Sequence, residues 1–462
     1  MKKLLHLPIG LLALLILVIG CSSSTGNDGK NDEFIDENSW IRETMSLYYF
    51  WNDLVPDQTD GSINPVPYFQ SMLDSTDTFS YIVEDAEELN SSLEGSAFTT
   101  GISPGFGIFA GTNEVFFVIE FVYPNTPAAE AGLNRGDIVL EVDGQTMTTS
   151  NYLELYYSGN STIDYTLGEY LPDQNAIANT DSVVTVNQLE LDLDPIAYTN
   201  VYEYGDRKIG YLFYARFLNG KDDVFIESMD NALQEFSNQG INELVVDLRY
   251  NPGGRISAAE NIANSIVPLS VAQSEEVFVS FQYNEGLQNF YEEQQGPNSP
   301  NLFVRFDEDP INLGLERVFF LTTSGSASAS ELIINGLDPH MGVIHIGENT
   351  FGKFYGSFVF TGDEATPPNN YGIVPVTLKY ANSLGVTDFR DGLTPDYVVP
   401  DSLVTNPYDI GDVNDAMFKT AIDIITGNNT GPAKIGPRRY EMLPDWYKLK
   451  RGNILGEKSV IK

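Results

Sequence analysis

The middle of the chain alternates between continuous apolar runs and helical patterns of apolar residues. Ile209–Phe217 has the composition of a strand, and residues 222–236 place apolar side chains every three or four positions, with Gly240 beyond the end of this predicted helix. Leu244–Leu248 is apolar except for one aspartate, as expected for a strand that is buried on both faces. Ile256–Ile266 predicts a second helix. This alternation indicates an α/β unit in which helices pack against a mixed sheet.

A β-rich pattern precedes the α/β unit. Val115–Val122 and Asp137–Val142 predict strands, and the second strand ends at an Asp-Gly turn. Between them, Thr126–Gly132 predicts a short helix that Thr126 caps and a glycine ends. The sequence from 145 to 181 predicts no defined element.

Helices are expected near both ends of the chain. Residues 39–55 repeat aromatic and apolar side chains at helical spacing, which predicts an amphipathic helix, and a second short helix is expected around Tyr68–Leu73. Asp412–Ile425 predicts a final helix. The polar and aromatic insertion Val271–Glu316 indicates no role.

The first residues have the pattern of a secretory signal, in which lysines precede the apolar segment Leu4–Gly20. Val18-Ile19-Gly20-Cys21 resembles a bacterial lipoprotein cleavage box, so we expect Cys21 to be lipidated and to tether the protein to a membrane in the bacterial cell envelope, facing the periplasm or the cell surface. An uncleaved anchor and a plain signal are the alternatives. Cys21 is the only cysteine, which excludes an intramolecular disulfide.

The composition is that of a folded and strongly acidic protein. The chain has 462 residues, of which 42% are hydrophobic, and a formal net charge of −40. This length predicts two or three domains, and the charge argues against nucleic acid as a partner. After Gly431 the sequence becomes basic, which indicates either a solvated extension or a contact with a membrane surface or a partner.

A turn rich in small residues carries the candidate chemistry. Arg317–Leu321 predicts a buried strand, and a helix is expected from Glu331 to Gly336. Between them lie Ser324, Ser326, Ser328 and Ser330, spaced by glycine and alanine. A serine hydroxyl at the positive end of a helix can act as a nucleophile when a base lies nearby.

Downstream of the serines, three residues are candidates for that base. His340 and His345 follow the serines, but His345 lies in an apolar run and is explained by strand packing. Lys353 is flanked by Phe351-Gly352 and Phe354-Tyr355, with no acidic residue closer in sequence than Glu348. In an enclosed apolar site the pKa of a lysine falls from about 10.4 towards 7, which makes it a base.

These motifs carry a family resemblance. Ser326-Ala327-Ser328-Ala329-Ser330-Glu331, followed by Gly347-Glu348-Asn349-Thr350-Phe351-Gly352-Lys353, resembles the active-site pair of the tail-specific, or carboxy-terminal processing, proteases. In that family the nucleophile is the serine before Ala-Ser-Glu, which is Ser328 here. The base is the lysine of the T-[FY]-G-K turn, which is Lys353 here. The alternative is that Ser328 caps a helix and Lys353 is solvated.

The same resemblance implies the remaining catalytic groups. Asp247-Leu248-Arg249, continued by Tyr250-Asn251-Pro252-Gly253-Gly254, matches the family pattern D-L-R-x-N-x-G-G, in which the amides of Gly254 and of Ala329 hold the oxyanion. By itself this Gly-Gly turn is also compatible with a phosphate cradle or a plain tight turn. Many members have a glutamine four residues after the lysine, where it helps to orient the amine. This chain has Ser357 there, and we expect either Ser357, with its shorter reach, or another group to hydrogen-bond the amine.

The β-rich unit resembles the PDZ domain that these proteases carry ahead of the catalytic core. The matching motif, A-x-x-A-G-L-x-x-G-D-I-V-L-x-V-D-G, begins at Ala128. PDZ domains add a chain terminus as a strand and hold its carboxylate with loop amides. Gly105, Phe106, Gly107 and Ile108 occupy the corresponding loop and are the expected substrate-binding residues.

The resemblance implies a serine endopeptidase with a Ser-Lys dyad and a crotonase/ClpP-like core, acting on protein or peptide substrates without a metal or cofactor. A homo-oligomer is a further possibility. The alternative is a non-catalytic protein that binds an apolar ligand or a peptide terminus on the same fold. The expected domains are a signal peptide (1–20), a flexible tether (21–38), a helical region (39–95), a PDZ-like domain (96–190), the catalytic core (200–405) and a C-terminal helix with a basic tail (406–462).

Overall fold

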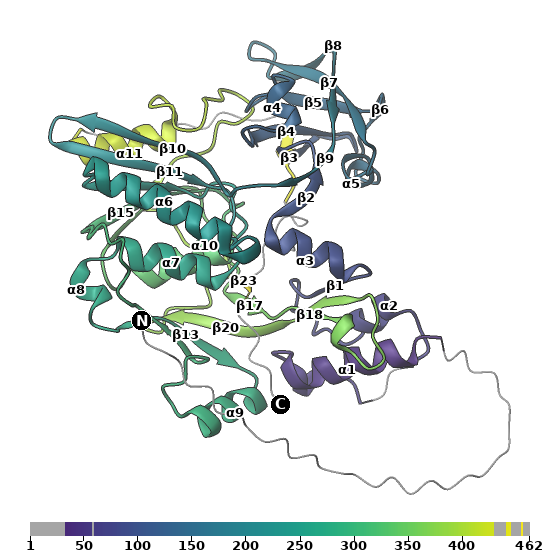
Figure 1. Cartoon of the computed structure of the whole chain (residues 1–462). Helices are drawn as coiled ribbons and strands as arrows, with labels where there is room; N and C mark the ends of the chain where they lie inside the picture. The colour runs from purple at the N-terminus through teal and green to yellow at the C-terminus, as the bar shows by residue number, and fades with distance from the viewer. Residues whose placement is uncertain (1–32, 58–59, 429–439, 445–453, 456–462) are drawn as a thin grey trace, which may run out of the picture.

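The structure is a computed structural model that describes residues 33–57, 60–428, 440–444 and 454–455 (Figure 1). The predicted signal peptide, Cys21 and the basic positions of the tail lie outside the described residues. Within the described ranges, none of the helices has the length and apolar character needed to cross a bilayer.

The core is built on a six-stranded sheet with the order β10-β11-β12-β15-β16-β21, in which β10 and β11 are antiparallel and the later pairs are parallel. Its strands are β10 (Ile196–Tyr204), β11 (Arg207–Tyr214), β12 (Glu243–Asp247), β15 (Arg317–Thr322), β16 (Gly342–Gly347) and β21 (Tyr397–Val398). Successive residues point to opposite faces, so Val245 and Phe319 join one buried cluster while Val246 and Phe320 join another. Both faces are therefore covered, as the apolar strand pattern predicts.

Helices cover the two faces of this sheet. One face packs against helices whose apolar side chains belong to the larger cluster, and the other face packs against the last helix (Figure 1). The helices on the first face are α6 (Val224–Gln239), α7 (Ile256–Ile266) and α10 (Ala329–Leu337), and the helix on the second face is α11 (Ala416–Thr426). The short helix α8 (Leu269–Ala272) follows α7 in the chain. The predicted apolar face of α6 is buried, with Gly240 as its left-handed C-cap. Asp415 caps α11, so this helix begins later than predicted.

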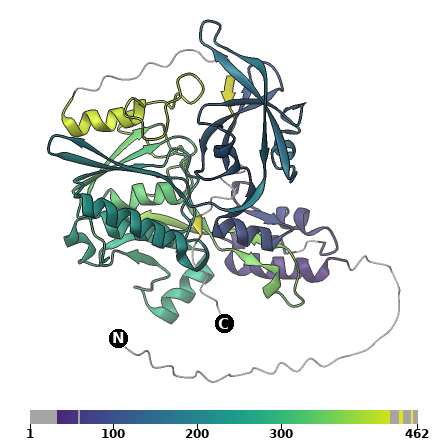
Figure 2. The same cartoon turned by 45° about the horizontal axis from the view of Figure 1, so that its top comes forward.

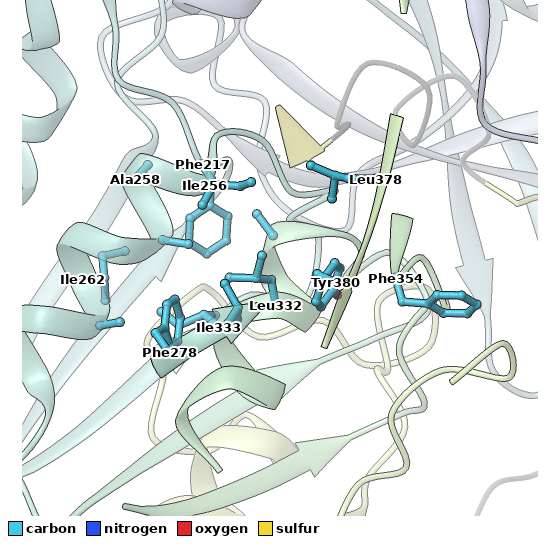
Figure 3. Packing of buried hydrophobic residues seen from close by; sticks show 14 of the residues in the cluster. Phe217, Ile256, Ala258, Ile262, Phe278, Leu332, Ile333, Phe354, Leu378 and Tyr380 are labelled. Atoms are coloured by element: carbon cyan, nitrogen blue, oxygen red, sulfur yellow. The ribbon is translucent and has the colours of Figure 1, made fainter. Parts of the chain in front are cut away.

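A second, five-stranded sheet lies against α10, with the order β14-β13-β20-β17-β23. It contains β13 (Val277–Tyr283), β14 (Phe303–Arg305), β17 (Tyr355–Ser357), β20 (Val376–Asn382) and β23 (Ile454–Leu455). The insertion without a predicted role thus supplies β13 and β14, and also α9 (Glu285–Gln295). Leu332 and Ile333 of α10 lie between Phe278 and Tyr380 of this sheet and the side chains of α7 (Figure 3).

Gly336 lies inside α10 and does not end it, contrary to the prediction. A Cβ at this position would lie 2.3 Å from the ring of Phe278, so the glycine allows the second sheet to approach the helix closely. The signal was interpreted as a helix stop because propensity favours that role for glycine. Close packing decides it here.

The N-terminal region packs beside the second sheet (Figures 1 and 2). It contains α1 (Ile35–Tyr48), a 3-10 turn η1 (Asn52–Leu54), α2 (Pro65–Gln70), β1 (Tyr81–Val83) and α3 (Ala86–Glu94). β1 joins β19 (Gly372–Val374) and β18 (Phe360–Thr361) in a three-stranded sheet, with the turn η3 (Gly362–Glu364) between the latter two. The helix predicted over 39–55 ends at Tyr48, because Tyr49 adopts an extended conformation.

The PDZ-like unit is a sheet with the order β22-β3-β4-β5-β7-β8, and β6 pairs with β5. Its elements are β3 (Ile102–Phe109), β4 (Val115–Val122), α4 (Pro127–Glu130), β5 (Ile138–Val142), β6 (Gln145–Thr146), α5 (Tyr152–Tyr156), β7 (Thr162–Leu171), β8 (Ala176–Asn187) and β22 (Tyr440–Met442), and it is flanked by the paired strands β2 (Ser96–Thr99) and β9 (Leu189–Asp192). Gly105–Ile108, predicted as a loop, lies within β3. Thr126 occupies the N-cap of α4, but its hydroxyl donates to Tyr123 O and not to the helix.

Candidate active site

The turn after β15 places Ser328 at the N-terminus of α10 in a strained conformation. Ser328 has φ 63° and ψ −112°, in the left-handed region that side-chain-bearing residues rarely adopt. Strain of this kind persists only where surrounding contacts hold it, and it concentrates at functional sites. Ala329 follows as the first residue of α10.

Hydrogen bonding separates Ser328 from the other serines of the turn. Ser326 Oγ donates to Leu248 O at 2.7 Å, and Ser330 Oγ donates to Asn251 O at 2.9 Å, so both hydroxyls fix the turn to the loop after β12. Ser328 Oγ is buried and has no hydrogen-bond partner among the described residues. Ser328 and Glu331 have the arrangement of a capping box, in which the Glu331 carboxylate accepts the backbone N–H of Ser328.

One carboxylate joins the serine turn to the lysine turn. Glu331 is fully buried, and its Oε2 accepts hydrogen bonds from the backbone nitrogens of Ser328 and Lys353, each at 2.8 Å. Its Oε1 accepts from Thr350 Oγ1 and Gly352 N, each at 2.6 Å. Burial raises the pKa of Glu331, while these donors oppose the rise. The buried Glu331 carboxylate thus joins the serine turn to the lysine turn through backbone hydrogen bonds.

Lys353 lies in the enclosed environment that the sequence predicts. Its side chain is fully buried, and burial lowers its pKa to about 7. Nζ lies 5.1 Å from the ring centroid of Phe79, which the N-terminal region contributes. The carboxylates of Asp77 and Glu331 raise this pKa, but by less than burial lowers it. Acidic groups distant in sequence are therefore present, although desolvation dominates.

The lysine amine and the serine hydroxyl are both available for reaction. Lys353 Nζ, like Ser328 Oγ, makes no hydrogen bond to any described residue, and the two atoms are not hydrogen-bonded to each other. The expected bond from Ser357 is also absent, because Ser357 Oγ is buried without a partner in the described part of the chain. Ser357 follows a register shift in β17, and its short side chain does not reach the amine resting on Phe79.

The Gly-Gly turn lies directly against the nucleophile candidate. A Cβ on Gly253 would lie 2.6 Å from Ser328 Cβ and 2.8 Å from Ala329 N, and Gly253 has φ +103°. Gly253 N donates to Asn251 Oδ1 at 2.9 Å and is therefore occupied. Phe217 pairs through Gly253 O and Arg255 N, so the amide of Gly254 points away from Phe217.

The two histidines do not belong to this site. His345 lies in β16 with Nε2 at 2.5 Å from Thr322 Oγ1, and burial lowers its pKa to about 4. His340 Nδ1 lies 3.1 Å from Glu276 Oε2, and His340 follows the C-terminal end of α10, whose N-terminus carries Ser328. The interpretation of His345 as a packing residue is confirmed.

A cavity connects the serine turn with the PDZ-like unit. It has a volume of about 400 Å³ and is lined by Thr323–Gly325, Glu120 of β4, and Tyr440 and Met442–Pro444 of the C-terminal segment. Nearby, buried Arg135 donates to Asp401 Oδ1 at 2.9 Å and so attaches the PDZ-like unit to the core.

Sequence reasoning missed Phe79, Asp77, Gly253 and the role of Glu331. Glu331 carried a signal, because it follows the serine by three residues, the spacing of a capping box. Phe79 and Asp77 carried none, since they lie about 275 residues from Lys353 in the chain and only the fold brings them to it.

Comparisons with known proteins agree with this architecture. Residues 208–399 match peptidase family S41, residues 36–81 match the peptidase S41 N-terminal domain, and residues 118–161 match a PDZ domain. A carboxyl-terminal-processing protease from Picosynechococcus sp. is 25% identical over 335 residues, covering 71% of this chain and 72% of the relative.

Two solved structures share the fold. A putative S41 protease from Bacteroides fragilis superposes with a TM-score of 0.68 at 24% identity, covering 84% of this chain and 97% of that one. The photosystem II D1 C-terminal processing protease superposes with a TM-score of 0.50 at 18% identity, covering 80% and 93%. The chain therefore belongs to peptidase family S41, among the carboxyl-terminal processing proteases that carry a PDZ domain.

Proposed function

We propose that the protein is a serine endopeptidase in which Ser328 is the nucleophile and Lys353 is the general base. The observation that carries this proposal is a fully buried amine without a hydrogen-bond partner among the described residues, whose pKa is lowered to about 7. The turn beside it presents a buried hydroxyl that is equally without a partner. An amine that is neutral near pH 7 can activate a serine without histidine.

The reaction follows from these groups. Neutral Lys353 accepts the proton of Ser328 as Oγ attacks the substrate carbonyl carbon, and the amides of Gly254 and Ala329 donate to the oxyanion. Protonated Lys353 then gives its proton to the leaving amine as the C–N bond breaks. Water hydrolyses the acyl ester by the same proton transfers in reverse order. The amine must leave the face of Phe79 to reach Oγ, and catalytic hydrogen bonds commonly tighten only when substrate is bound.

Substrate selection belongs to the PDZ domain in this proposal. A substrate carboxy terminus adds to β3 along Gly105–Ile108, and the chain upstream of it extends towards the serine turn. Cys21, when lipidated, holds the protein in the bacterial cell envelope. Proteins of that compartment with exposed termini are then the substrates.

Cleavage of an unfolded protein, such as casein, tests the catalytic roles. Ser328→Ala and Lys353→Ala should each abolish cleavage while the unfolding transition persists. A serine-directed phosphonate should label Ser328 in the parent and not in Lys353→Ala. Binding of apolar ligands without labelling or cleavage would favour a non-catalytic binding protein on this fold, and near-native cleavage by Lys353→Ala would reject the lysine as base.

A further inference from the structure

The C-terminal segment adds a strand, β22, to the edge of the PDZ sheet formed by β3. β22 pairs antiparallel with β3, with Tyr440 opposite Phe109, Glu441 opposite Ile108 and Met442 opposite Gly107. Leu443 N extends the pairing by donating to Phe106 O at 2.8 Å. Figure 2 shows this yellow strand beside the blue strands of the PDZ domain. The hydrogen-bonding groups along this edge are therefore already used, and another strand cannot add there at the same time.

The side chains of the segment alternate between two apolar surfaces. Tyr440 is buried, with its ring 5.7 Å from that of Phe116, in a cluster that also contains Leu403 and Val404 of the core. Leu443 packs on the opposite side, against the cluster around Phe106 in the PDZ interior. Alternate side chains entering separate pockets are how an added strand is recognised.

The segment matches a docked terminus in direction but lacks its charge. Leu443 N donates to Phe106 O, next to Gly105, where a terminal residue is expected to bind. The chain continues into Pro444, so no carboxylate is available at this point. The contact area is also small, because the side chains of Glu441 and Met442 are exposed and only Tyr440 and Leu443 join the apolar clusters. A true terminus therefore has an interaction that the resident segment does not.

The resident segment also lies on the route to the active site. Tyr440 and Met442–Pro444 line the same cavity as Thr323–Gly325, the turn that leads to Ser328. The next described residues, Ile454–Leu455, pair with Gly356 and Ser357 in the strand that follows Lys353. Both contacts therefore lie beside the segments that carry Ser328 and Lys353.

We propose that residues 440–443 are a built-in ligand of the PDZ groove, which a substrate carboxy terminus displaces. The proposal rests on the proposed function, in which this groove binds substrate termini. It also defines the ligand that the groove accepts: a strand ending in a leucine-like residue, with an aromatic residue three positions earlier. Tethering keeps the resident segment at a high effective concentration, so only a fraction of the grooves is open. The apparent affinity for a free peptide is the intrinsic affinity multiplied by that fraction.

Peptide binding to the full-length Ser328→Ala protein tests the displacement. The ligand is a fluorescein-labelled peptide with a Gly-Ser-Gly-Ser spacer, the sequence Tyr-Glu-Met-Leu and a free carboxylate, followed by fluorescence anisotropy. Tyr440→Ala combined with Leu443→Asp removes both anchors and should tighten peptide binding by about tenfold. Glu441→Gln alters an exposed side chain of the same strand and should leave the affinity unchanged.

A reversible lock provides the opposite perturbation. Ile108 and Glu441 are register partners, and cross-strand pairs of this type have Cα separations of about 5.5 Å, within the range of a disulfide. Ile108→Cys with Glu441→Cys, in a Cys21→Ser background that leaves no other thiol, should bind no peptide when oxidised and recover on reduction. Equal peptide affinity in the parent, the opened variant and both redox forms of the lock would overturn the proposal.

The same assay separates this inference from the proposed function. If the opened variant binds the acid peptide and its amidated form equally while the lock blocks both, displacement stands and recognition of the carboxylate fails. If neither peptide binds the opened variant, the groove is not a terminus-binding site. Both proposals about the PDZ domain would then be wrong. The catalytic roles of Ser328 and Lys353 are tested separately, by casein cleavage and phosphonate labelling.

Discussion

Lys353 N donates to Glu331 Oε2 at 2.8 Å, and the same oxygen accepts the backbone N–H of Ser328 at 2.8 Å. One atom therefore sets the separation of the two turns that carry the proposed nucleophile and base. Tyr380 adds a second bridge on the carbonyl side, since its hydroxyl lies 3.3 Å from Ser328 O and 3.4 Å from Lys353 O. The backbones of both residues are fixed, and only their side chains are left to move.

Replacing Glu331 should disconnect the two turns. The Glu331 carboxylate accepts from four donors, two on each oxygen. In Glu331→Gln an NH2 group replaces one of these oxygens, and it cannot accept the two donors that point at it. Two buried donors lose their acceptor, at a cost of about 1–3 kcal/mol each, so we expect about 2–6 kcal/mol of lost stability and a loss of cleavage. Urea unfolding and casein cleavage measure the two effects.

Glu316→Gln is the matched control, because Glu316 is exposed immediately before β15. It should change neither quantity. Wild-type stability and cleavage in Glu331→Gln would show that the turns keep their spacing without the carboxylate.

The pH dependence of cleavage should report the lysine. Because Lys353 has a pKa of about 7 and acts as a base only when neutral, kcat/KM should rise through pH 7 and level off above it. Lys353→Arg should be inactive at every pH, since a guanidinium keeps its proton. A rate that is flat from pH 5 to 9 in the parent would contradict the assignment.

Phe79→Ala should shift this profile to higher pH. The ring covers the amine, and removing it admits water that stabilises the charged form, which raises the pKa of Lys353 by about 1 unit. The loss of the cation–π contact opposes this rise, because it removes an attraction that acts only on the charged amine. Phe98→Ala, at an exposed phenylalanine of β2, should leave the midpoint in place. An unmoved midpoint in Phe79→Ala would assign the low pKa to other parts of the enclosure.

The sequence identified the parts of the site that lie in continuous motifs. Strand β15, the serine turn and helix α7 occur close to where the hydrophobic pattern predicts them, because both faces of the core sheet are buried and the pattern follows burial. Asp247-Leu248-Arg249 was matched as a motif, yet its buried ion pairs to Asp415 depend on a helix 166 residues away. Family resemblance, not periodicity, identified Lys353.

The missing parts depend on contacts between distant segments. No local pattern places Phe79 on Lys353, and none indicates that residues 440–443 complete the PDZ sheet, because an isolated three-residue strand has almost no signal of its own. Gly105–Ile108 was predicted as a loop because it occupies the place of the PDZ loop whose amides hold a carboxylate. Its glycines suggested a turn, whereas Gly107 is needed because a Cβ there would lie 2.4 Å from the ring of Phe116.

Gly253→Ala should impair catalysis more than stability. The added Cβ would press on Ser328 and on the amide of Ala329, so the loop must shift at the point where the oxyanion is expected. Loss of one oxyanion donor costs about 10²–10³ in kcat, and we expect an effect in that range. Gly61→Ala is the control, because nothing lies within 4 Å of a Cβ there. Equal kcat in both variants would remove the Gly-Gly turn from the mechanism.

Lys353→Met should stabilise the fold, and the gain should depend on pH. The lysine has a pKa of about 7 when folded and an ordinary value of 10.5, so between these values the unfolded chain binds a proton that the folded chain does not. The cost of burying the charge is therefore complete below pH 7, decreases as the pH rises and vanishes above 10.5. A shift of this size corresponds to a cost of about 5 kcal/mol.

Urea unfolding of Lys353→Met should accordingly show a gain of about 5 kcal/mol at pH 6 that falls to about 1 kcal/mol at pH 10. Lys419→Met replaces an exposed lysine paired with Asp423 and should show no comparable gain at either pH. A gain in Lys353→Met that is equal at both pH values would come from packing alone. It would mean that the amine is charged and compensated in the folded protein, and a charged amine cannot serve as the base.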